Sequence, residues 1–193
     1  MPDLTIALAG NPNAGKTTVF NALTRSQQHV GNWPGKTVER KHGTWRVNGL
    51  EIEVIDLPGT YSLTAYTVEE IIARDYLLKT PPDIVVVVVD AAHLERNLYL
   101  VIQLLELELK TIVALNMSDI ADSKGIRIDA EALSTLLGGA PVVRVIATRG
   151  SGLEELRDQV LKTQKRSREL VIEQEQVCPP SVRRFGWLIM AQR

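Results

Sequence analysis

GNPNAGKT, residues 10–17, is the stretch from which the fold of this chain is best predicted. It follows the apolar run Leu4 to Ala9, which is typical of a buried strand, and it precedes a helical pattern from Lys16 to Thr24. A strand, a glycine-rich turn and a helix start direct several backbone N–H groups at one point, and such a point binds phosphate. The spacing G-x-x-x-x-G-K-T in this context therefore predicts a phosphate-binding loop.

The residue types in this loop have separate tasks. Gly10 and Gly15 permit a close backbone approach that a Cβ would obstruct. Lys16 can reach the β- and γ-phosphates of a nucleotide, and the Thr17 hydroxyl can ligate Mg²⁺. The loop residues expected to contact the nucleotide are Gly10, Asn11, Asn13, Ala14, Gly15, Lys16, Thr17 and Thr18.

The composition indicates a globular chain without a nucleic-acid partner. Hydrophobic residues make up 45% and charged residues 23%, which is typical of a protein with one sizeable core. The net charge of −1 gives no electrostatic reason to expect nucleic acid. Cys178 is the only cysteine, so an intramolecular disulfide is impossible. Because no signal-peptide pattern begins the chain and no apolar run approaches the ~20 residues that span a bilayer, we expect it to be soluble.

Strand patterns alternate with helical patterns, which predicts an α/β fold with a mostly parallel, six-stranded sheet in a three-layer P-loop NTPase architecture. Asn48-Gly49 between two strand patterns predicts a hairpin, so one strand should run antiparallel to the others. Residues 25–38 show no clear period, and we expect a loop there. The expected strands are 4–9, 39–47, 50–55, 84–89, 111–115 and 142–146, and the expected helices are 16–24, 67–78, 94–109, 129–137 and 153 to about 163.

The composition changes after Lys162, where a charge-rich segment is followed by Cys178-Pro179-Pro180 and an apolar tail. We therefore expect one nucleotide-binding domain over residues 1–163 and a short C-terminal helical extension over residues 164–193.

Polar residues after the strand at 111–115 indicate which base is bound. In open α/β sheets, ligands lie at the carboxyl ends of strands. The Asp119 carboxylate can accept hydrogen bonds from both guanine N1–H and the exocyclic amine, whereas adenine lacks that pair of donors. A ligand that leaves such a group unsatisfied can be rejected by factors of about 10⁴–10⁵. The residues expected around the base are Asn116, Met117, Asp119 and, through backbone amides near guanine O6, Ala147, Thr148 and Arg149.

Two further loops are expected to detect the γ-phosphate. The Asp56 carboxylate can hold Mg²⁺ through a water molecule, and the Gly59 amide can meet the γ-phosphate. The Thr37 hydroxyl, in the same loop as Gly35, can close over Mg²⁺ and that phosphate. Loss of the phosphate would release this loop, which is the order–disorder change of a nucleotide switch.

These stretches, in this order and at strand ends, resemble the Ras-like superfamily of P-loop GTPases. Three segments, GNPNAGKTT at 10–18, VGNWPGKTVER at 30–40 and DLPGTYSL at 56–63, are similar to the N-terminal G domain of the FeoB family of bacterial ferrous iron transport proteins. The resemblance covers residues 4 to about 162. It implies a slow GTPase that binds GTP and GDP, and residues 164–193 would begin a helical domain that influences GDP binding.

The resemblance also implies the setting of the chain. Such a G domain lies at the cytoplasmic face of the bacterial inner membrane and powers or gates Fe²⁺ uptake by the membrane part of the same polypeptide. Small cytosolic accessory proteins and further copies of the chain are expected partners, and nucleic acid is not. This chain would then be a cytosolic fragment.

Finally, the resemblance implies a K⁺ site, with Asn13 and the carbonyls of Gly31 and Trp33 as ligands. A cation near the β–γ bridge would stabilise charge in the transition state, as an arginine finger does elsewhere. The residues expected to act in hydrolysis are Asn13, Lys16, Thr37 and Gly59. Thr60 stands where Ras-like enzymes place a water-orienting glutamine, which implies a slow rate.

Two departures from the family pattern are Ala147, where many relatives have serine, and Lys36, where an apolar residue is common. Two alternatives stay open: an RNA- or ribosome-associated GTPase, which would need a basic RNA-binding module, and a nucleotide-binding regulator that does not hydrolyse GTP. His29, His42 and His93 are scattered along the chain without the spacing of a metal site, so we expect surface or core histidines.

Overall fold

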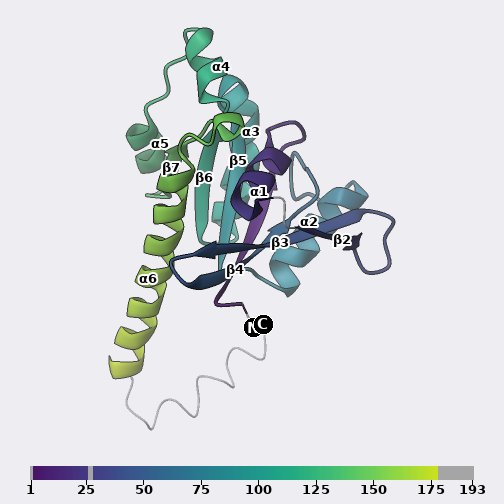
Figure 1. Cartoon of the computed structure of the whole chain (residues 1–193), viewed down its shortest axis with the longest axis vertical. Helices are drawn as coiled ribbons and strands as arrows, with labels where there is room; N and C mark the ends of the chain where they lie inside the picture. The colour runs from purple at the N-terminus through teal and green to yellow at the C-terminus, as the bar shows by residue number, and fades with distance from the viewer. Residues whose placement is uncertain (1, 26–27, 178–193) are drawn as a thin grey trace. The chain divides into compact units, whose positions relative to one another are not determined.

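The computed structural model describes residues 2–25 and 28–177, and the strands of this part form one seven-stranded sheet in the order β2-β3-β4-β1-β5-β6-β7 (Figure 1). The strands are β1 Leu4–Gly10, β2 Gln28–Asn32, β3 Glu39–Val47, β4 Leu50–Asp56, β5 Ile84–Asp90, β6 Thr111–Asn116 and β7 Val142–Arg144. The helices are α1 Lys16–Thr24, α2 Val68–Lys79, α3 Leu94–Glu106, α4 Ser118–Ser123, α5 Ala130–Leu136 and α6 Leu153–Val177, with 3₁₀ turns η1 Ala91–His93 and η2 Ala147–Arg149.

The sheet is organised around β1. This strand pairs in parallel with β4 on one side and with β5 on the other, and β6 and β7 continue the parallel set. Among the described strands only β3 runs the other way, pairing antiparallel with β2 and β4. The mostly parallel α/β fold with one antiparallel strand is thus confirmed. β1 leads through α1 to β2 at one edge, and its neighbour β5 leads through α3 to β6 on the other side, so the carboxyl ends of β1 and β5 form the switch point at which such sheets bind ligands.

The prediction of a loop over residues 25–38 is wrong in part, because β2 forms there and raises the strand count from six to seven. β2 is polar apart from Val30, whose side chain is 56% exposed. The strand is held at the edge of the sheet by its backbone pairing with β3. A strand stabilised by its backbone rather than by an apolar face leaves no alternating pattern in the sequence.

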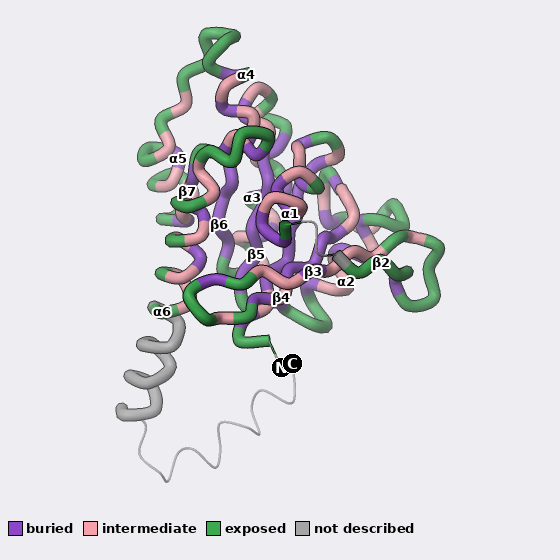
Figure 2. The backbone as a smooth tube through the Cα atoms, viewed as in Figure 1, coloured by how far each residue is buried: buried purple, intermediate pink, exposed green. Residues whose placement is uncertain are grey.

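Helices cover both faces of the sheet: α1 lies in front of it in Figure 1, and α2 and α3 lie behind. Ala7 and Ala9 of β1 belong to a hydrophobic core that also contains Leu77 of α2 and Leu104 of α3. The residue between them, Leu8, points to the opposite face because side chains alternate along a strand. On that face α1 contacts β1, β3 and β4. The central strands are accordingly buried along most of their length (Figure 2).

Helix ends differ from the prediction by a few residues, except in α6. Thr67, expected as the first residue of a helix, is the N-cap of α2: its hydroxyl accepts from the Glu70 amide at 3.2 Å, and the Glu70 carboxylate accepts from the Thr67 amide at 3.4 Å. This reciprocal pair is a capping box. α6 continues to Val177 instead of ending near Thr163, because the charge-rich segment consists mainly of good helix formers.

The chain divides into two compact units, Met1–Val160 and Leu161–Arg193. The first contains all seven described strands and the whole predicted phosphate loop. The proposed role of residues 164–193 stays a prediction, and Cys178 and the apolar tail lie outside the described residues. Within the described ranges, no helix has the length and apolar character needed to cross a membrane.

Candidate nucleotide site

The loop between β1 and α1 borders a hollow of about 580 Å³. Its lining residues are Asn11, Pro12, Asn13, Gly15, Lys16, Thr17, Thr18, Gly59 and Met117. Gly15 has a φ of 85°, and a Cβ at this position would collide with the Asn116 side-chain amide. Glycine is therefore required both by the backbone angle and by the close neighbour. The sequence predicted the composition of this loop, and the structure brings most of it together around one space.

Asn11 is an orphaned polar group beside this space. Its side chain is buried, and neither its Oδ1 nor its Nδ2 has a hydrogen-bond partner among the described residues. Buried amides are nearly always hydrogen-bonded to protein, to water or to a ligand. The unsatisfied amide therefore fits a loop whose contacts are completed by a bound polar molecule.

Lys16, the first residue of α1, forms a buried ion pair with Asp56, the last residue of β4. The Lys16 Nζ donates to Asp56 Oδ1, and the two side chains are only 10% and 8% exposed. Two charges buried together stabilise one another, whereas either one alone would be costly at this depth. The ion pair fixes the lysine head group at the edge of the phosphate loop.

The segment from Leu57 to Thr60 is attached to β1 by its backbone. The Leu57 amide donates to the Leu8 carbonyl at 3.0 Å, and the Thr60 amide donates to the Gly10 carbonyl at 3.2 Å. Between them, a Cβ on Gly59 would lie 3.4 Å from the Pro12 backbone. Gly59 consequently packs closely against the phosphate loop and lines its hollow, and the predicted contact of its amide with a γ-phosphate stays a prediction.

The loop between β2 and β3 is closed on itself and is anchored by Trp33. The Trp33 amide donates to the Val38 carbonyl at 3.0 Å, and the Lys36 amide donates to the Trp33 carbonyl at 2.9 Å. The Trp33 side chain is buried, whereas Gly35 and Thr37 are exposed. Neither these residues nor Gly31 line the hollow at the phosphate loop. The structure therefore does not bring the predicted Thr37, Gly31 and Trp33 contacts to the other predicted ligands.

Trp33 is held by contacts that the sequence did not reveal. Its indole meets the ring of Tyr76 on α2 edge to face, with centroids 5.5 Å apart, and the Arg40 guanidinium lies 5.2 Å from its centroid. Burial and the nearby Glu53 carboxylate raise the pKa of Tyr76 to about 12, against the opposing effect of Arg40. Trp33, the first residue after β2, is thus packed against α2, the helix that follows the segment containing Gly59.

Asn116, at the end of β6, connects two loops. Its Nδ2 donates to the Ala14 carbonyl at 3.0 Å, and its Oδ1 accepts from the Ala147 amide at 3.1 Å. The side chain is 3% exposed, and both ends of its amide are engaged within the protein. Asn116 therefore positions the phosphate loop relative to η2, a role that spacing alone did not distinguish from direct contact with a base.

Asp119 lies in the first turn of α4, and its side chain is 29% exposed. Its Oδ2 is 3.5 Å from Arg149 Nη2 of η2, so two residues predicted for the base pocket are brought together from different loops. The Ala147 amide donates to Asn116, and the Arg149 amide donates to the Ile146 carbonyl at 3.0 Å. Two of the three backbone amides expected near guanine O6 are therefore engaged within the protein.

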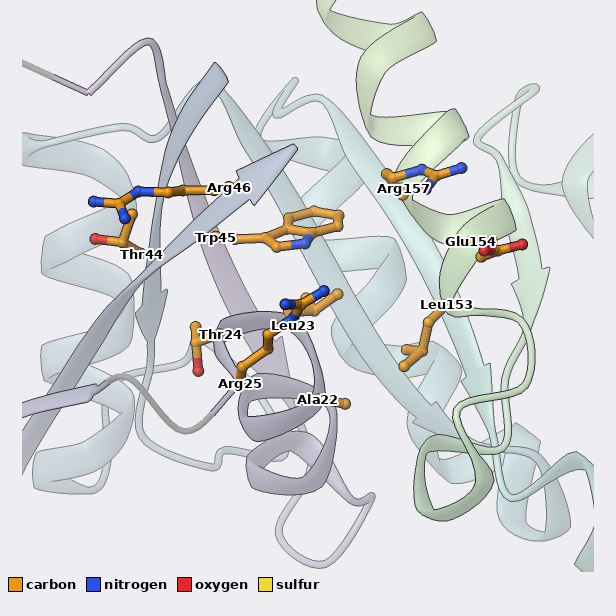
Figure 3. A pocket seen from close by; sticks show the side chains of 10 residues that line it. All are labelled: Ala22, Leu23, Thr24, Arg25, Thr44, Trp45, Arg46, Leu153, Glu154 and Arg157. Atoms are coloured by element: carbon orange, nitrogen blue, oxygen red, sulfur yellow. The ribbon is translucent and has the colours of Figure 1, made fainter. Parts of the chain in front are cut away.

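A second hollow, of about 390 Å³, lies at the opposite end of α1 from the phosphate loop (Figure 3). It is bordered by the last turn of α1, by β3 and by the first turns of α6. Three arginines line it, but Arg46 is 3.9 Å from Glu51 and Arg157 donates to Asp158 at 3.1 Å. Figure 3 shows the Arg46 and Arg157 head groups well separated, so this hollow presents no convergent set of polar groups.

The sequence positions of the three histidines suggested that all of them are isolated, but the structure brings two of them together. His29 and His42 are cross-strand partners in β2 and β3, and their rings are in contact. His93 is on η1, where its Nδ1 is 2.7 Å from Asp90 Oδ2. Within the described residues, no group of three or more His, Cys, Asp or Glu side chains is already arranged to hold a metal ion.

The sheet order, the phosphate loop after β1 and the Asn116 connection define a P-loop nucleotide-binding domain of the Ras-like type. Residues 4–160 match the family described as ferrous iron transport protein B, and the chain belongs to that family.

Similar proteins of known name agree with this assignment. The chain is 54% identical over 161 residues to the Fe(2+) transporter FeoB of Salmonella typhimurium, an alignment that covers 81% of this chain and 21% of the relative. The chain therefore spans about a fifth of the length of that relative. The structure of the FeoB G domain from Methanococcus jannaschii is 46% identical, with a TM-score of 0.75, and covers 86% of this chain and 99% of that one.

The cytosolic domain of the T. maritima FeoB iron transporter is 48% identical in two nucleotide forms. Its GDP form matches with a TM-score of 0.81 over 84% of this chain and 64% of that one. Its GMPPNP form matches with a TM-score of 0.80, and the match covers 82% of this chain and 63% of that one. Both forms of that protein therefore share the fold described here.

Proposed function

We propose that this chain is a GTP-binding and GTP-hydrolysing switch domain of bacterial ferrous iron uptake. The observation that carries the proposal is the hollow where Lys16, Thr17 and Gly59 meet at the carboxyl ends of β1 and β4. The GDP and GMPPNP forms of the T. maritima relative support guanine nucleotides as ligands. The name of the Salmonella relative supports the link to Fe²⁺ transport.

In this proposal the nucleotide phosphates lie at the N-terminus of α1, where backbone N–H groups and the helix dipole favour negative charge. Lys16 exchanges part of its interaction with Asp56 for the β- and γ-phosphates. Asp119 accepts hydrogen bonds from the guanine base, and Asn116 keeps the base loops in register with the phosphate loop. The Gly59 amide meets the γ-phosphate. The presence or loss of the γ-phosphate therefore changes the conformation of the segment that leads to α2.

The donor set fits Mg²⁺. The Thr17 hydroxyl and the Asp56 carboxylate, the latter through water, are oxygen ligands of the kind this ion prefers, and Thr37 would add a third. When bound, Mg²⁺ would neutralise charge on the phosphates. Asn13 is exposed, with a φ of 67°, and lies at the rim of the loop. It would hold K⁺ with the carbonyls of Gly31 and Trp33 only after the loop between β2 and β3 moves toward the phosphate loop, because these residues do not line the hollow. That ion would add positive charge near the β–γ bridge.

Hydrolysis transfers the γ-phosphoryl group to water and breaks its bond to the β-phosphate oxygen. Thr60, which stands at the water-orienting position of Ras-like enzymes, is buried and its amide is already bonded to the Gly10 carbonyl. In this proposal, backbone groups of the loop around Thr37 orient the water in place of a glutamine side chain, and the intrinsic rate is slow.

The wider setting is part of the same proposal. The domain would act at the cytoplasmic face of the inner membrane on the transporter portion of its own polypeptide, with accessory proteins or further copies as additional partners. Residues 164–193 would begin a helical domain that influences GDP release.

Turnover of GTP in KCl compared with NaCl tests the proposal. We expect slow phosphate release that is faster in KCl, and Asn13→Ala should remove the difference between the two salts while GDP binding persists. GTP that stays intact in both salts would contradict the enzymatic assignment. A K⁺ response that persists in Asn13→Ala would place the K⁺ site elsewhere.

A further inference from the structure

Two histidines that lie 13 positions apart in the sequence form a pair on the sheet. His29 of β2 and His42 of β3 are register partners, and their ring centroids are 5.3 Å apart with the ring planes inclined by 31°. Directly opposed residues on neighbouring antiparallel strands point to the same face, with Cβ atoms about 4.5–5.5 Å apart. Both imidazoles are therefore presented to one space.

That space is a hollow of about 400 Å³, separate from the one at the phosphate loop. Its lining residues are Pro2, His29, His42, Gly43, Thr44, Glu51 and Glu53. Glu53 of β4 is the register partner of Thr44, which is two residues after His42 and so on the same face of the sheet. The Glu51 carboxylate is 3.9 Å from Arg46. Of the two carboxylates that line the hollow, Glu53 is thus the better placed to bind the same ligand as the two imidazole rings.

His42 also has an unsatisfied atom. Its Nδ1 is buried and has no hydrogen-bond partner among the described residues. Leaving a buried nitrogen without a partner is energetically unfavourable, so such atoms usually mark a site completed by water, an ion or a ligand. A polar nitrogen of this kind cannot be satisfied by a purely hydrophobic occupant of the hollow.

The separation of the rings suits one shared ion. With metal–nitrogen bonds of about 2.0–2.1 Å in tetrahedral geometry, the centroids of two coordinating imidazoles lie roughly 5 Å apart. We propose that His29 and His42 bind one divalent transition-metal ion of the kind that imidazole prefers, such as Zn²⁺, with the Glu53 carboxylate and water completing the coordination. The two rings are already positioned, and Glu53 would reorient on binding.

The ion would join an edge strand to the body of the sheet. β2 pairs only with β3 in the described sheet, and it leads directly into Trp33 and the loop that contains Thr37. Coordination by one residue of each strand adds a side-chain link to the backbone pairing. This site differs in its chemistry from the Mg²⁺ and K⁺ sites proposed above, because hard cations select oxygen ligands.

Calorimetric titration of the metal-free full chain with Zn²⁺, in phosphate-free buffer containing excess Mg²⁺, tests the site. We expect one Zn²⁺ to bind per chain. His29→Asn and His42→Asn should each weaken binding by at least about tenfold, since loss even of an outer-shell partner can cost 10–100-fold. His93→Asn is the matched control and should leave the affinity unchanged, because His93 lies on η1.

Absence of Zn²⁺ binding, or binding that survives in both pair variants, would overturn the proposal, as would equal loss in His93→Asn. Unchanged affinity in Glu53→Gln would overturn the assignment of Glu53 alone. A second measurement needs no variant: the chain has three histidines, so ring-proton NMR signals can be followed individually. Zn²⁺ should shift two of the three sets, and a shift of only one set, or of none, would contradict a shared ion.

Discussion

The buried amide of Asn116 connects the phosphate loop to the turn after β7. Replacing it by alanine leaves the Ala14 carbonyl and the Ala147 amide without their partner. An unsatisfied buried backbone group costs about 1–3 kcal/mol. We therefore expect Asn116→Ala to lower the free energy of unfolding by a few kcal/mol in urea titrations, and to weaken GDP binding because the two loops lose their register.

Asn97 provides a matched control for this prediction. It is equally buried, its Oδ1 accepts from the Asp90 amide at 3.3 Å and its Nδ2 donates to the His93 carbonyl at 2.8 Å, away from the phosphate loop. Asn97→Ala should destabilise the chain similarly and leave GDP affinity unchanged in the remaining folded protein. Equal loss of GDP affinity in both variants would show that Asn116 contributes only to stability.

Asp119 should determine the choice of base. Its carboxylate offers two acceptors, which suit the N1–H and amino donors of guanine. In Asp119→Asn one acceptor becomes a donor, so the side chain should favour xanthine, whose carbonyl replaces the guanine amino group. We expect GDP affinity to fall by about tenfold or more and xanthosine diphosphate affinity to rise. Competition binding with both nucleotides measures this, and an unchanged preference would remove Asp119 from the base pocket.

At the scale of elements, the start of α2 depends on one carboxylate. Glu70 is buried and accepts hydrogen bonds from the Ser62 and Thr64 hydroxyls and from the amides of Tyr66 and Thr67. Burial by itself raises the pKa of Glu70, but these hydrogen bonds outweigh it and hold the pKa below its ordinary value of 4.5. The carboxylate therefore fixes residues 62–67, which connect the Gly59 segment to α2, to the first turn of that helix.

This lowered pKa gives a pH dependence with a definite sign. Folding favours the ionised form, so the stabilisation is complete above pH 4.5 and is lost as the pH falls through the lower, folded-state pKa. Glu70→Gln should lower the free energy of unfolding at pH 7 by about 0.5–2 kcal/mol, the range for helix caps. Urea titrations at a series of pH values should show this difference shrinking below pH 4.5.

Glu69 is the control for the element-scale prediction. It occupies the same first turn of α2 and is exposed. Glu69→Gln removes the same charge from the helix dipole and should change stability much less than Glu70→Gln. If the two substitutions have equal effects, the helix dipole and not the hydrogen-bonded carboxylate explains the contribution.

Sequence patterns predicted the elements that have an apolar face and missed those that do not. β5 is a continuous β-branched run and was predicted within a residue of its end. β2 and the short helix α4 depend on backbone pairing and on a turn, so no period identified them. In the same way, motif spacing predicted several residues that line the hollow at the phosphate loop. It did not predict the contact of Trp33 with Tyr76, because these two residues are distant in sequence and belong to no common motif.

At the scale of the whole molecule, the first unit should fold without the second. All seven described strands and the hydrophobic core around Leu77 and Leu104 lie before residue 161. We therefore expect a nucleotide-free chain of residues 1–163 to unfold in one transition, with the same midpoint as the nucleotide-free 193-residue chain. Differential scanning calorimetry measures the midpoint of each chain.

The result of a truncation depends on where the chain is ended, because the first turns of α6, up to Val160, belong to the first unit. Leu156 and Val160 are fully buried. A chain ending at Gly152 loses both side chains, which contribute roughly 1.5–3 kcal/mol each on burial, against a total stability of about 5–15 kcal/mol for a typical domain. It should unfold at a clearly lower temperature than the 1–163 chain. Equal midpoints for the two truncations would mean that α6 does not belong to the core of the nucleotide-binding unit, and a lower midpoint for residues 1–163 would move the domain boundary toward the C-terminus.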